Sequence, residues 1–129
     1  MSDDTLANSL STIKNHSEIR KSEFEISPAS NLIESILEVM KGEGYVDGFE
    51  HIDDGKGGRL DVKMAGNIND CGVIKPRFSV EHDNFEKWEK RYLPAEGFGI
   101  LAVSTPDGVI SHKEAKEKDK GGRLLAFFY

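Results

Sequence analysis

The end of the chain, from Ser104 to Tyr129, most limits the possible folds. It follows an apolar run, Phe98 to Val103, and it ends in a second apolar run, Leu124 to Tyr129. Nearly continuous apolar runs of this length are typical of buried strands. After the first run comes a loop of hydroxyls and glycine, residues 104–108, just ahead of a predicted helix start. We therefore expect two buried strands of one small sheet, with polar groups gathered at a strand end.

The charged segment between the two runs predicts a short surface helix. Ser111 and Glu114 have the spacing of a capping box, which places the helix start at Ser111. Only Ala115 is apolar between Ser111 and Lys120, so this helix cannot belong to the core. A helix N-terminus presents free N–H groups and a partial positive charge, which suit an anion such as phosphate. A plain solvated helix explains the same residues, and both interpretations stay open.

Composition limits the size and surroundings of the fold. With 129 residues and 37% hydrophobic content, the chain can build one compact unit or two small sub-domains. A single cysteine, Cys71, excludes an internal disulfide framework and fits a reducing cytosol. No apolar run approaches the roughly 20 residues that span a bilayer, and the N-terminus lacks a signal pattern. We therefore expect a cytoplasmic protein.

The first half of the chain predicts the order helix, strand, helix, strand, strand. Apolar spacing favours a helix from about Asp3 to His16 and a short strand at residues 23–26. Ser27 before Pro28 predicts the start of the second helix, because proline suits the first helical position. Residues 45–52 and 59–65 predict a hairpin across a glycine-rich loop. The expected buried side chains of the helices and the first strand are Leu6, Leu10, Ile13, Phe24, Ile26, Ile33, Ile36, Leu37 and Met40.

Two sub-domains follow from this pattern, in an α/β (α+β) fold. We expect residues 1–66 to form an N-terminal α/β sub-domain with a three-stranded sheet. We expect residues 67–129 to form a C-terminal RNA-binding sub-domain, with a small mixed or antiparallel sheet and short helices. Its first segment, Gly72 to Val80, reads as extended, with Lys75 and Arg77 on the same side. These cations suit a phosphate backbone, although an edge strand guarded by charge and proline explains them as well.

The aromatic residues Phe85, Trp88 and Tyr92 lie at spacings of three and four, which places them on one face of a short helix. Such a stripe is more often part of a core than a base-stacking surface. Arg91 and Tyr92 could still reach a nucleic acid at the rim.

Several motifs occur in one order along nearly the whole chain. The C-terminal signature is Gly99-Ile100-Leu101-Ala102-Val103-Ser104-Thr105, then Gly108-Val109-Ile110, His112, Glu114-Ala115 and Gly121-Gly122. Together with residues 6–15, 28–30, 44–46 and 52–55, it resembles the ribosomal protein S-eight family, the eighth protein of the small ribosomal subunit. Residues 71–78 and 85–94 resemble the longer archaeal and eukaryotic branch, and the archaeal context fits better. Ordered motifs at family spacing are more specific than any single one.

The resemblance implies a structural protein that binds the central domain of small-subunit rRNA and supports its folding and subunit assembly. Neighbouring small-subunit proteins would be further partners. In the family, a Ser-Thr-Ser motif is implied to touch an internal loop of a central-domain helix. Here Pro106 stands at the third position, which removes one hydroxyl and one backbone donor. Bacterial members tend to carry an acid where Arg123 stands, which is a second departure.

Short hydroxyl side chains both donate and accept, which suits a 2′-OH, and cations anchor phosphates. Lys14 and Asn15 are implied by the resemblance, although a helix C-terminal dipole and cap explain them equally well. The candidate rRNA-binding residues are Ser104, Thr105, Pro106, Gly108, Ser111, His112, Lys113, Gly121, Gly122, Arg123, Lys75, Arg77, Lys14, Asn15 and Ser30.

The net charge of −6 argues against an RNA-binding protein, since such proteins usually show a basic footprint. Its distribution weakens the objection. Residues 1–66 hold 13 acidic and 7 basic side chains, whereas residues 67–129 hold 10 of each. The segment 111–123 has 5 basic and 3 acidic side chains. Phosphate contact depends on such a local patch rather than on the total. A net negative charge also suits a cytoplasm of high salt concentration, where long-range electrostatic attraction between protein and RNA is screened.

Catalysis, a cofactor, a metal site and a small-molecule substrate are not expected. His112 and Glu114 are two residues apart and do not share a helix face. Cys71 has no histidine near it in sequence, the four histidines are scattered, and the chain has neither a CxxC motif nor a phosphate-binding loop. The alternative function is a protein-interaction module or translational regulator that uses the aromatic helix.

Overall fold

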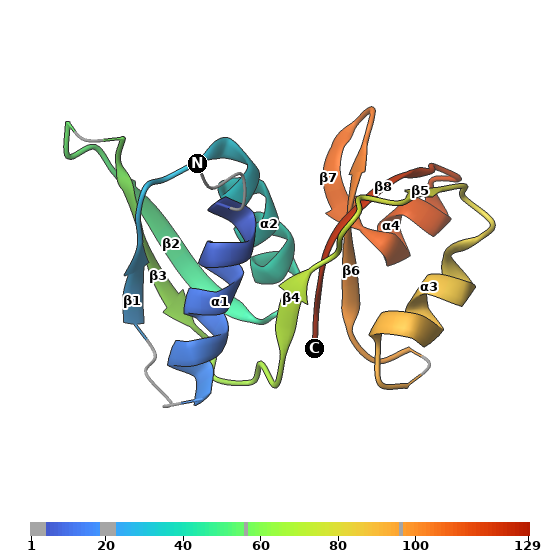
Figure 1. The fold of residues 1–129 in the computed structure, drawn as a ribbon, viewed down its shortest axis with the longest axis horizontal. Coiled ribbons are helices and arrows are strands. Elements are labelled where there is room, and N and C mark those ends of the chain that lie inside the picture. The colour runs from blue at the N-terminus through green and yellow to red at the C-terminus, as the bar shows by residue number, and fades with distance from the viewer. Residues whose placement is uncertain (1–4, 19–22, 56, 96) are drawn as a thin grey trace. The chain divides into compact units, whose positions relative to one another are not determined.

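Alternating charged and apolar residues form a three-stranded antiparallel sheet in the first part of the chain. The computed structural model describes residues 5–18, 23–55, 57–95 and 97–129 (Figure 1). The strands are β1 (Glu23–Ile26), β2 (Val46–Ile52) and β3 (Arg59–Met64), in the order β1-β3-β2. Val62 of β3 lies opposite Phe24 of β1, and both are buried. The predicted strand at 23–26 is confirmed at both ends.

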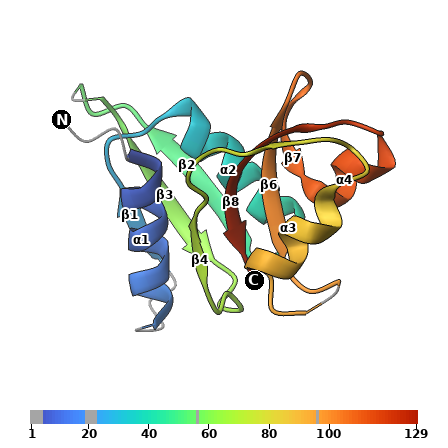
Figure 2. The same ribbon diagram turned by 45° about the vertical axis from the view of Figure 1, so that its right-hand side comes forward.

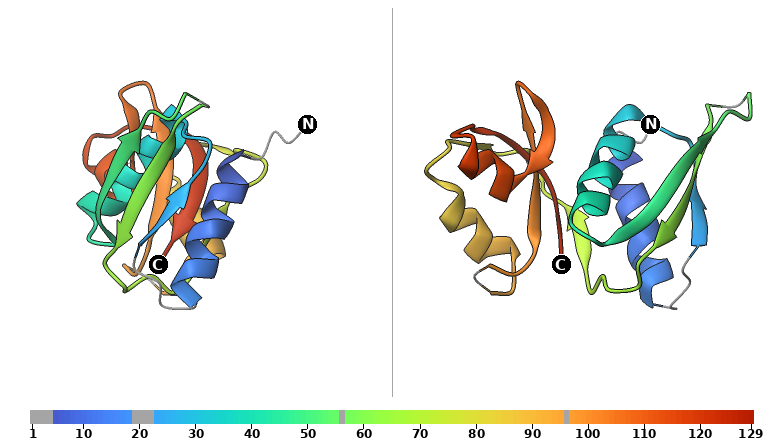
Figure 3. Two further views of the ribbon diagram at one scale, coloured as in Figure 1. Left: turned by 90° about the vertical axis from the view of Figure 1, so that its left-hand side faces the viewer. Right: turned by 180° about the vertical axis from the view of Figure 1, so that it is seen from behind.

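Two helices cover one side of this sheet (Figure 3). They are α1 (Thr5–Glu18) and α2 (Asn31–Gly42). Both follow the predicted apolar spacing, because side chains three and four residues apart share one helix face. The predicted inward side chains are buried: Leu6, Leu10, Ile13, Phe24, Ile26, Ile33, Ile36, Leu37 and Met40. The predicted helix start at Asp3 lies outside the described residues.

The predicted start of α2 at Ser27-Pro28 is wrong. Ser30 is the N-cap, and its hydroxyl accepts a hydrogen bond from the backbone N–H of Ile33 at 3.2 Å. The residues before it are held by the hairpin loop, since the N–H of Ala29 donates to the carbonyl of Gly58 at 3.1 Å. The helix therefore begins three residues later, at Asn31, where a side-chain cap is available.

The second part of the chain builds a five-stranded antiparallel sheet. The path is β4-β8-β6-β7, and β5 also pairs with β8. The first two strands are short and lie along one side of β8, with an irregular segment at residues 74–78 between them. The bounds are β4 (Cys71–Val73), β5 (Ser79–Val80), β6 (Ile100–Thr105), β7 (Gly108–Ser111) and β8 (Gly122–Phe128).

Two short helices, α3 (Phe85–Tyr92) and α4 (His112–Glu117), lie on one side of this sheet (Figure 2). Phe85 and Trp88 of α3 belong to the core, so the predicted aromatic stripe is structural at these two positions. The same core contains Leu101 and Val103 of β6, Leu124 of β8 and Ala115 of α4. The chain divides into two compact units, residues 1–69 and 70–129.

Candidate nucleic-acid interface

The hydroxyl loop is a tight β-hairpin turn. Pro106 and Asp107 are its two turn residues, and Thr105 of β6 lies opposite Gly108 of β7. Gly108 has φ of +114°, a conformation that side-chain-bearing residues rarely adopt. The buried Thr105 hydroxyl donates to the Gly108 carbonyl at 2.8 Å and accepts from the Asp107 N–H at 3.1 Å. Thr105 therefore holds the turn together from inside.

This role of Thr105 can be tested by stability. We expect Thr105→Val to lower the free energy of unfolding by about 1–2 kcal/mol, because two backbone groups of the turn lose their partner. Thr105→Ser keeps the hydroxyl and serves as the matched control, with a smaller loss in urea denaturation. Equal losses in both variants would contradict the assignment.

The predicted loop and the predicted helix start lie at the expected residues, but the predicted arrangement lacks strand β7, which separates the two. Ser111 at the start of α4 lies opposite Ala102, whereas Gly108 lies opposite Thr105. At about 3.4 Å per residue, three residues of β7 hold the two features about 10 Å apart. The loop hydroxyls and the backbone N–H groups at the helix start therefore do not form a single binding site.

A polar row crosses the sheet near the hairpin instead. Ser104 of β6 lies opposite Arg123 of β8, which lies opposite Ser79 of β5. Directly opposed residues of antiparallel strands project from the same face, so this row places two hydroxyls beside a guanidinium. On the other side of Ser104 lies Val109 of β7. Ser104 and Arg123 were predicted candidates; Ser79 was missed, because only the strand register brings it here.

Two glycines allow the strands of this row to approach closely. A Cβ on Gly122 would overlap the carbonyl oxygen of Ser104, and one on Gly121 would lie 2.5 Å from the carbonyl oxygen of Val80. Neither glycine has a positive φ, so the need for glycine is steric. The predicted Gly121-Gly122 pair thus lets β8 begin between β5 and β6 and places Arg123 beside Ser104.

Ser111 and His112 are buried in the second unit, where their side chains accept hydrogen bonds from backbone N–H groups. The Ser111 hydroxyl accepts from the N–H of Glu114 at 3.1 Å, which confirms the predicted helix start. His112 is only 1% exposed. Its Nδ1 accepts from the N–H of Leu101 at 3.0 Å, so Nε2 carries the proton and faces Glu89 Oε1 at 3.3 Å. The prediction of His112 as an rRNA-binding residue does not fit this buried side chain.

Burial and the local charges set the ionisation of this pair. Desolvation lowers the pKa of His112 below its ordinary 6.5, although the Glu89 carboxylate opposes this. Burial by itself raises the pKa of Glu89, but hydrogen bonds and charges from Lys116 and His112 outweigh it and hold this pKa below its ordinary 4.5. At neutral pH His112 is therefore uncharged, and Lys116 supplies the cation that Glu89 faces.

The lysines that follow are partly neutralised. Lys113 and Arg123 are exposed and make no ion pair within the part of the chain that the structure describes. Three other lysines each face a carboxylate, which reduces the positive charge available to a phosphate. These pairs are Lys116 with Glu89, Lys118 with Glu114, and Lys120 with Asp107.

Lys75 and Arg77 lie on a bend at the edge of the sheet. The N–H of Ile74 donates to the Leu125 carbonyl at 3.0 Å, and the Phe78 carbonyl accepts from the N–H of Leu124 at 2.9 Å. Residues 75–77 bulge outward between these two bonds, and both cations are exposed. The prediction of one extended segment from Gly72 to Val80 is wrong, because the chain bends at residues 75–76.

The remaining candidates belong to the first unit. Ser30 caps α2, as described above. Lys14 is half-buried and Asn15 is exposed on α1, which continues to Glu18. The predicted helix end at His16 is therefore two residues short, and Asn15 lies within the helix rather than at its cap.

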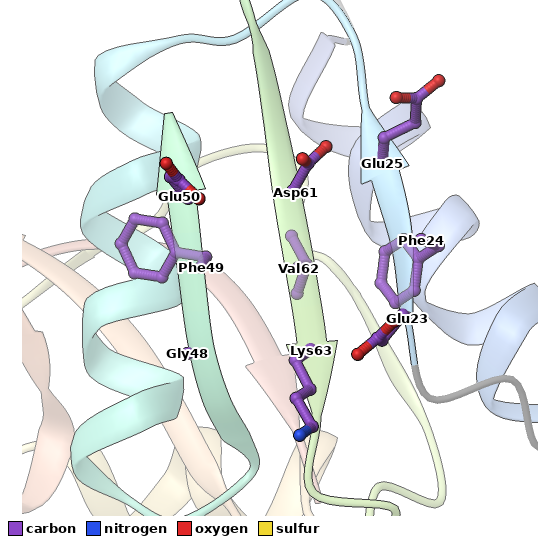
Figure 4. A pocket seen from close by; sticks show the side chains of 9 residues that line it. All are labelled: Glu23, Phe24, Glu25, Gly48, Phe49, Glu50, Asp61, Val62 and Lys63. Carbon is purple, nitrogen blue, oxygen red and sulfur yellow. The ribbon is translucent and has the colours of Figure 1, made fainter. Parts of the chain in front are cut away.

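A hollow of about 630 Å³ lies over the three-stranded sheet (Figure 4). Glu25, Asp61 and Glu50 form a cross-strand row there, and Glu23 lies nearby. Arg59 contacts both Glu25 and Asp61, at 3.2 and 3.1 Å. Among the described residues, no cluster of histidine, cysteine or carboxylates is arranged to hold a metal ion. The acidic lining would repel a polyanion, so the hollow does not suit RNA.

No helix within the described ranges is long and apolar enough to cross a membrane.

The comparisons with known proteins cover nearly the whole chain. The family described as Ribosomal protein S8 matches residues 4–129. Small ribosomal subunit protein uS8 of Haloquadratum walsbyi is 52% identical over 98% of this chain and 97% of its own length. The protein of the same name from Archaeoglobus fulgidus is 51% identical over the full length of both. The chain belongs to the ribosomal protein S8 family, in its archaeal branch.

Proposed function

We propose that this protein binds the central domain of small-subunit rRNA through the polar row Ser79, Ser104 and Arg123, with Lys113 and Arg77 as additional phosphate contacts. It would thereby support folding of that domain and subunit assembly in the cytoplasm, next to neighbouring small-subunit proteins. Membership of a structural, non-enzymatic family of the small ribosomal subunit supports the setting. The row itself is the observation that carries the proposal, since it joins two hydroxyls and an exposed guanidinium without a carboxylate partner among the described residues.

The chemistry of the row suits a folded RNA helix. The major groove of A-form RNA is too narrow for side chains to read, so proteins use 2′-hydroxyls, phosphates and irregular bases. Serine hydroxyls donate and accept, and a guanidinium binds phosphate with two parallel hydrogen bonds. Backbone spacing fixed by Gly121 and Gly122 presents these groups without a large rearrangement. A rigid surface of this kind stabilises one RNA arrangement over others.

The test is filter binding to the central-domain helix of the matching rRNA. We expect Ser104→Ala with Arg123→Gln to weaken binding roughly 10- to 100-fold, because a charged hydrogen bond and a neutral one are lost. The dependence of log K on log salt should become shallower by about one unit. The matched control, Ser35→Ala with Lys63→Gln, makes comparable changes on the first unit and should bind normally. Unchanged affinity in the first variant would rule out the row as the interface.

Burial of two of its three rings argues against the alternative, a protein-interaction module based on the aromatic helix. Phe85 and Trp88 of α3 are buried in the core of the second unit. Replacing Trp88 would therefore disturb folding before it affected a partner.

A further inference from the structure

A series of partly exposed aromatic side chains lies on the helix side of the five-stranded sheet. We call Tyr92, Phe127, Tyr129 and Phe98 the aromatic ladder. Successive ring centroids are 5.7, 6.2 and 6.2 Å apart. Phe98 is 46% exposed, and the other three rings are half-buried. These rings come from α3, from β8 and the residue after it, and from the loop before β6, so only the folded unit brings them together.

A guanidinium stands at one end of the aromatic ladder. Arg91 Cζ lies 5.4 Å from the Tyr92 ring centroid, and 5.3 and 5.5 Å from those of Phe78 and Trp88. Arg91 is exposed and makes no ion pair within the described ranges. Three rings therefore orient a cation whose hydrogen-bond donors remain available for an anion.

A further cation borders the same end. Lys87 Nζ lies 4.9 Å from the Trp88 ring centroid, one helical turn before Arg91. By contrast, Lys90 on the same helix faces Glu86 at 3.7 Å. Positive charge without a partner is thus concentrated where the aromatic ladder begins.

The aromatic ladder and the polar row occupy opposite faces of the sheet. Leu124 packs into the core beneath α3 and α4, so the neighbouring Arg123 projects from the other face. Phe127 and Tyr129 pack against that same core and therefore lie on the helix side. An irregularity in the β6–β8 register near Leu125 shifts the alternation between Arg123 and Phe127. One RNA helix seated on the polar row would leave the aromatic ladder open to a different segment.

We propose that the aromatic ladder with Arg91 is a second RNA-binding surface, for an unpaired, single-stranded segment. Aromatic rings accept any base by stacking, and a neighbouring cationic patch follows the phosphates, which is the usual chemistry of single-strand binding. An acidic peptide would match the cations but would leave the rings unused. The inference rests on the proposed function, because it takes RNA as the partner. It adds a second RNA segment, which is single-stranded, to the paired helix bound by the polar row. The protein would hold a paired helix on one face and an unpaired strand on the other.

The experiment measures fluorescence anisotropy with a short unstructured RNA of alternating adenine and cytosine. We expect Arg91→Gln with Phe98→Leu to weaken this binding about tenfold or more, because a cation and a stacking ring are lost. Both side chains are exposed, and the leucine side chain keeps apolar volume at position 98, so the thermal midpoint should stay near that of the wild type. Lys90→Gln, on the same helix but ion-paired, should bind the oligonucleotide normally.

Two further arms separate this inference from the proposed function. The Arg91 and Phe98 variant should bind the central-domain helix normally, and the Ser104 and Arg123 variant should bind the oligonucleotide normally. Suppose that the Ser104 and Arg123 variant retains helix binding while the Arg91 and Phe98 variant loses oligonucleotide binding. This result would support the aromatic ladder as an RNA-binding surface and would rule out the polar row as the interface with the helix.

Three outcomes overturn the aromatic ladder as an RNA-binding surface. The wild type could fail to bind the oligonucleotide, or the Arg91 and Phe98 variant could bind it unchanged. Equal competition by a polyglutamate peptide would also overturn it, since this would reveal a general anion or protein-docking surface. If the double variant loses thermal stability, Arg91→Gln alone is decisive, and normal oligonucleotide binding by it counts against the proposal.

Discussion

Replacing Gly122 with alanine is expected to lower the free energy of unfolding by ~3 kcal/mol or more. The new Cβ would overlap the carbonyl oxygen of Ser104 and lie 2.9 Å from Val103 Cγ1. The overlapped atom belongs to the backbone of β6, which pairs with both β7 and β8 and cannot move alone. Relief of the clash would require strands of the sheet to separate. Urea denaturation of the purified variant measures the loss.

Gly48→Ala is the matched control for this experiment. It adds the same methyl group to a strand, where nothing lies within 4 Å of the new atom and φ is not positive. Its free energy of unfolding should stay within about 0.5 kcal/mol of the wild type. Similar losses in both variants would mean that the approach of β8 to β6 is not the cause.

Replacing His112 with alanine is expected to cost roughly 3 kcal/mol at neutral pH. The change leaves a cavity between α3, α4 and β6 and removes the acceptor of the Leu101 N–H. It also removes one of the two cross-links from Glu89 to α4, while that to Lys116 remains. Thermal or urea unfolding at about pH 8, where histidine is neutral in both states, isolates this packing effect.

The same histidine makes the wild type sensitive to acid. The folded protein keeps His112 neutral, because burial and the Leu101 N–H both oppose a proton on Nδ1. The unfolded chain takes up that proton near the ordinary pKa of 6.5. Stability should therefore be full above pH 6.5 and should decline as the pH falls through the lower, folded pKa. Glu89 acts in the same direction below its ordinary 4.5, since its folded pKa is also lowered.

The difference between wild type and His112→Ala should therefore shrink as the pH falls below 6.5. Urea midpoints recorded from about pH 8 down to about pH 5 measure it, and the other histidines cancel in the comparison. A constant difference over this range would show that His112 titrates alike in the folded and unfolded states, contrary to its buried hydrogen bonds.

The elements of the first unit were predictable because their signals are local. Phe24 and Ile26 alternate with charged neighbours, and the stripe from Ile33 to Met40 repeats at helical spacing. Each pattern depends on residues a few positions apart, so it can be recognised in the sequence without knowledge of the rest of the fold. The start of α2 was missed because Gly58, far along the chain, holds Ala29 outside the helix.

The second unit depends more on contacts between distant residues. Strand β7 was missed, since Gly108 to Ser111 has neither clear alternation nor length. Ser79 entered the polar row only through the register of β5 with β8, and His112 left the surface only because Leu101 and Glu89 enclose it. None of these contacts between distant residues produces a periodic pattern in the sequence.

Local patterns along the chain were enough to establish the family, the two-part α+β organisation, the buried faces of the main helices and the cap at Ser111. They were enough because capping and amphipathic spacing are properties of neighbouring residues. Only the packing of the folded chain determined which polar side chains remain available to contact a binding partner. A hydroxyl or an imidazole looks the same in sequence whether it faces solvent, as Ser104 partly does, or satisfies a buried backbone group, as Thr105 and His112 do. That choice depends on burial and strand register, which exist only once distant segments have packed.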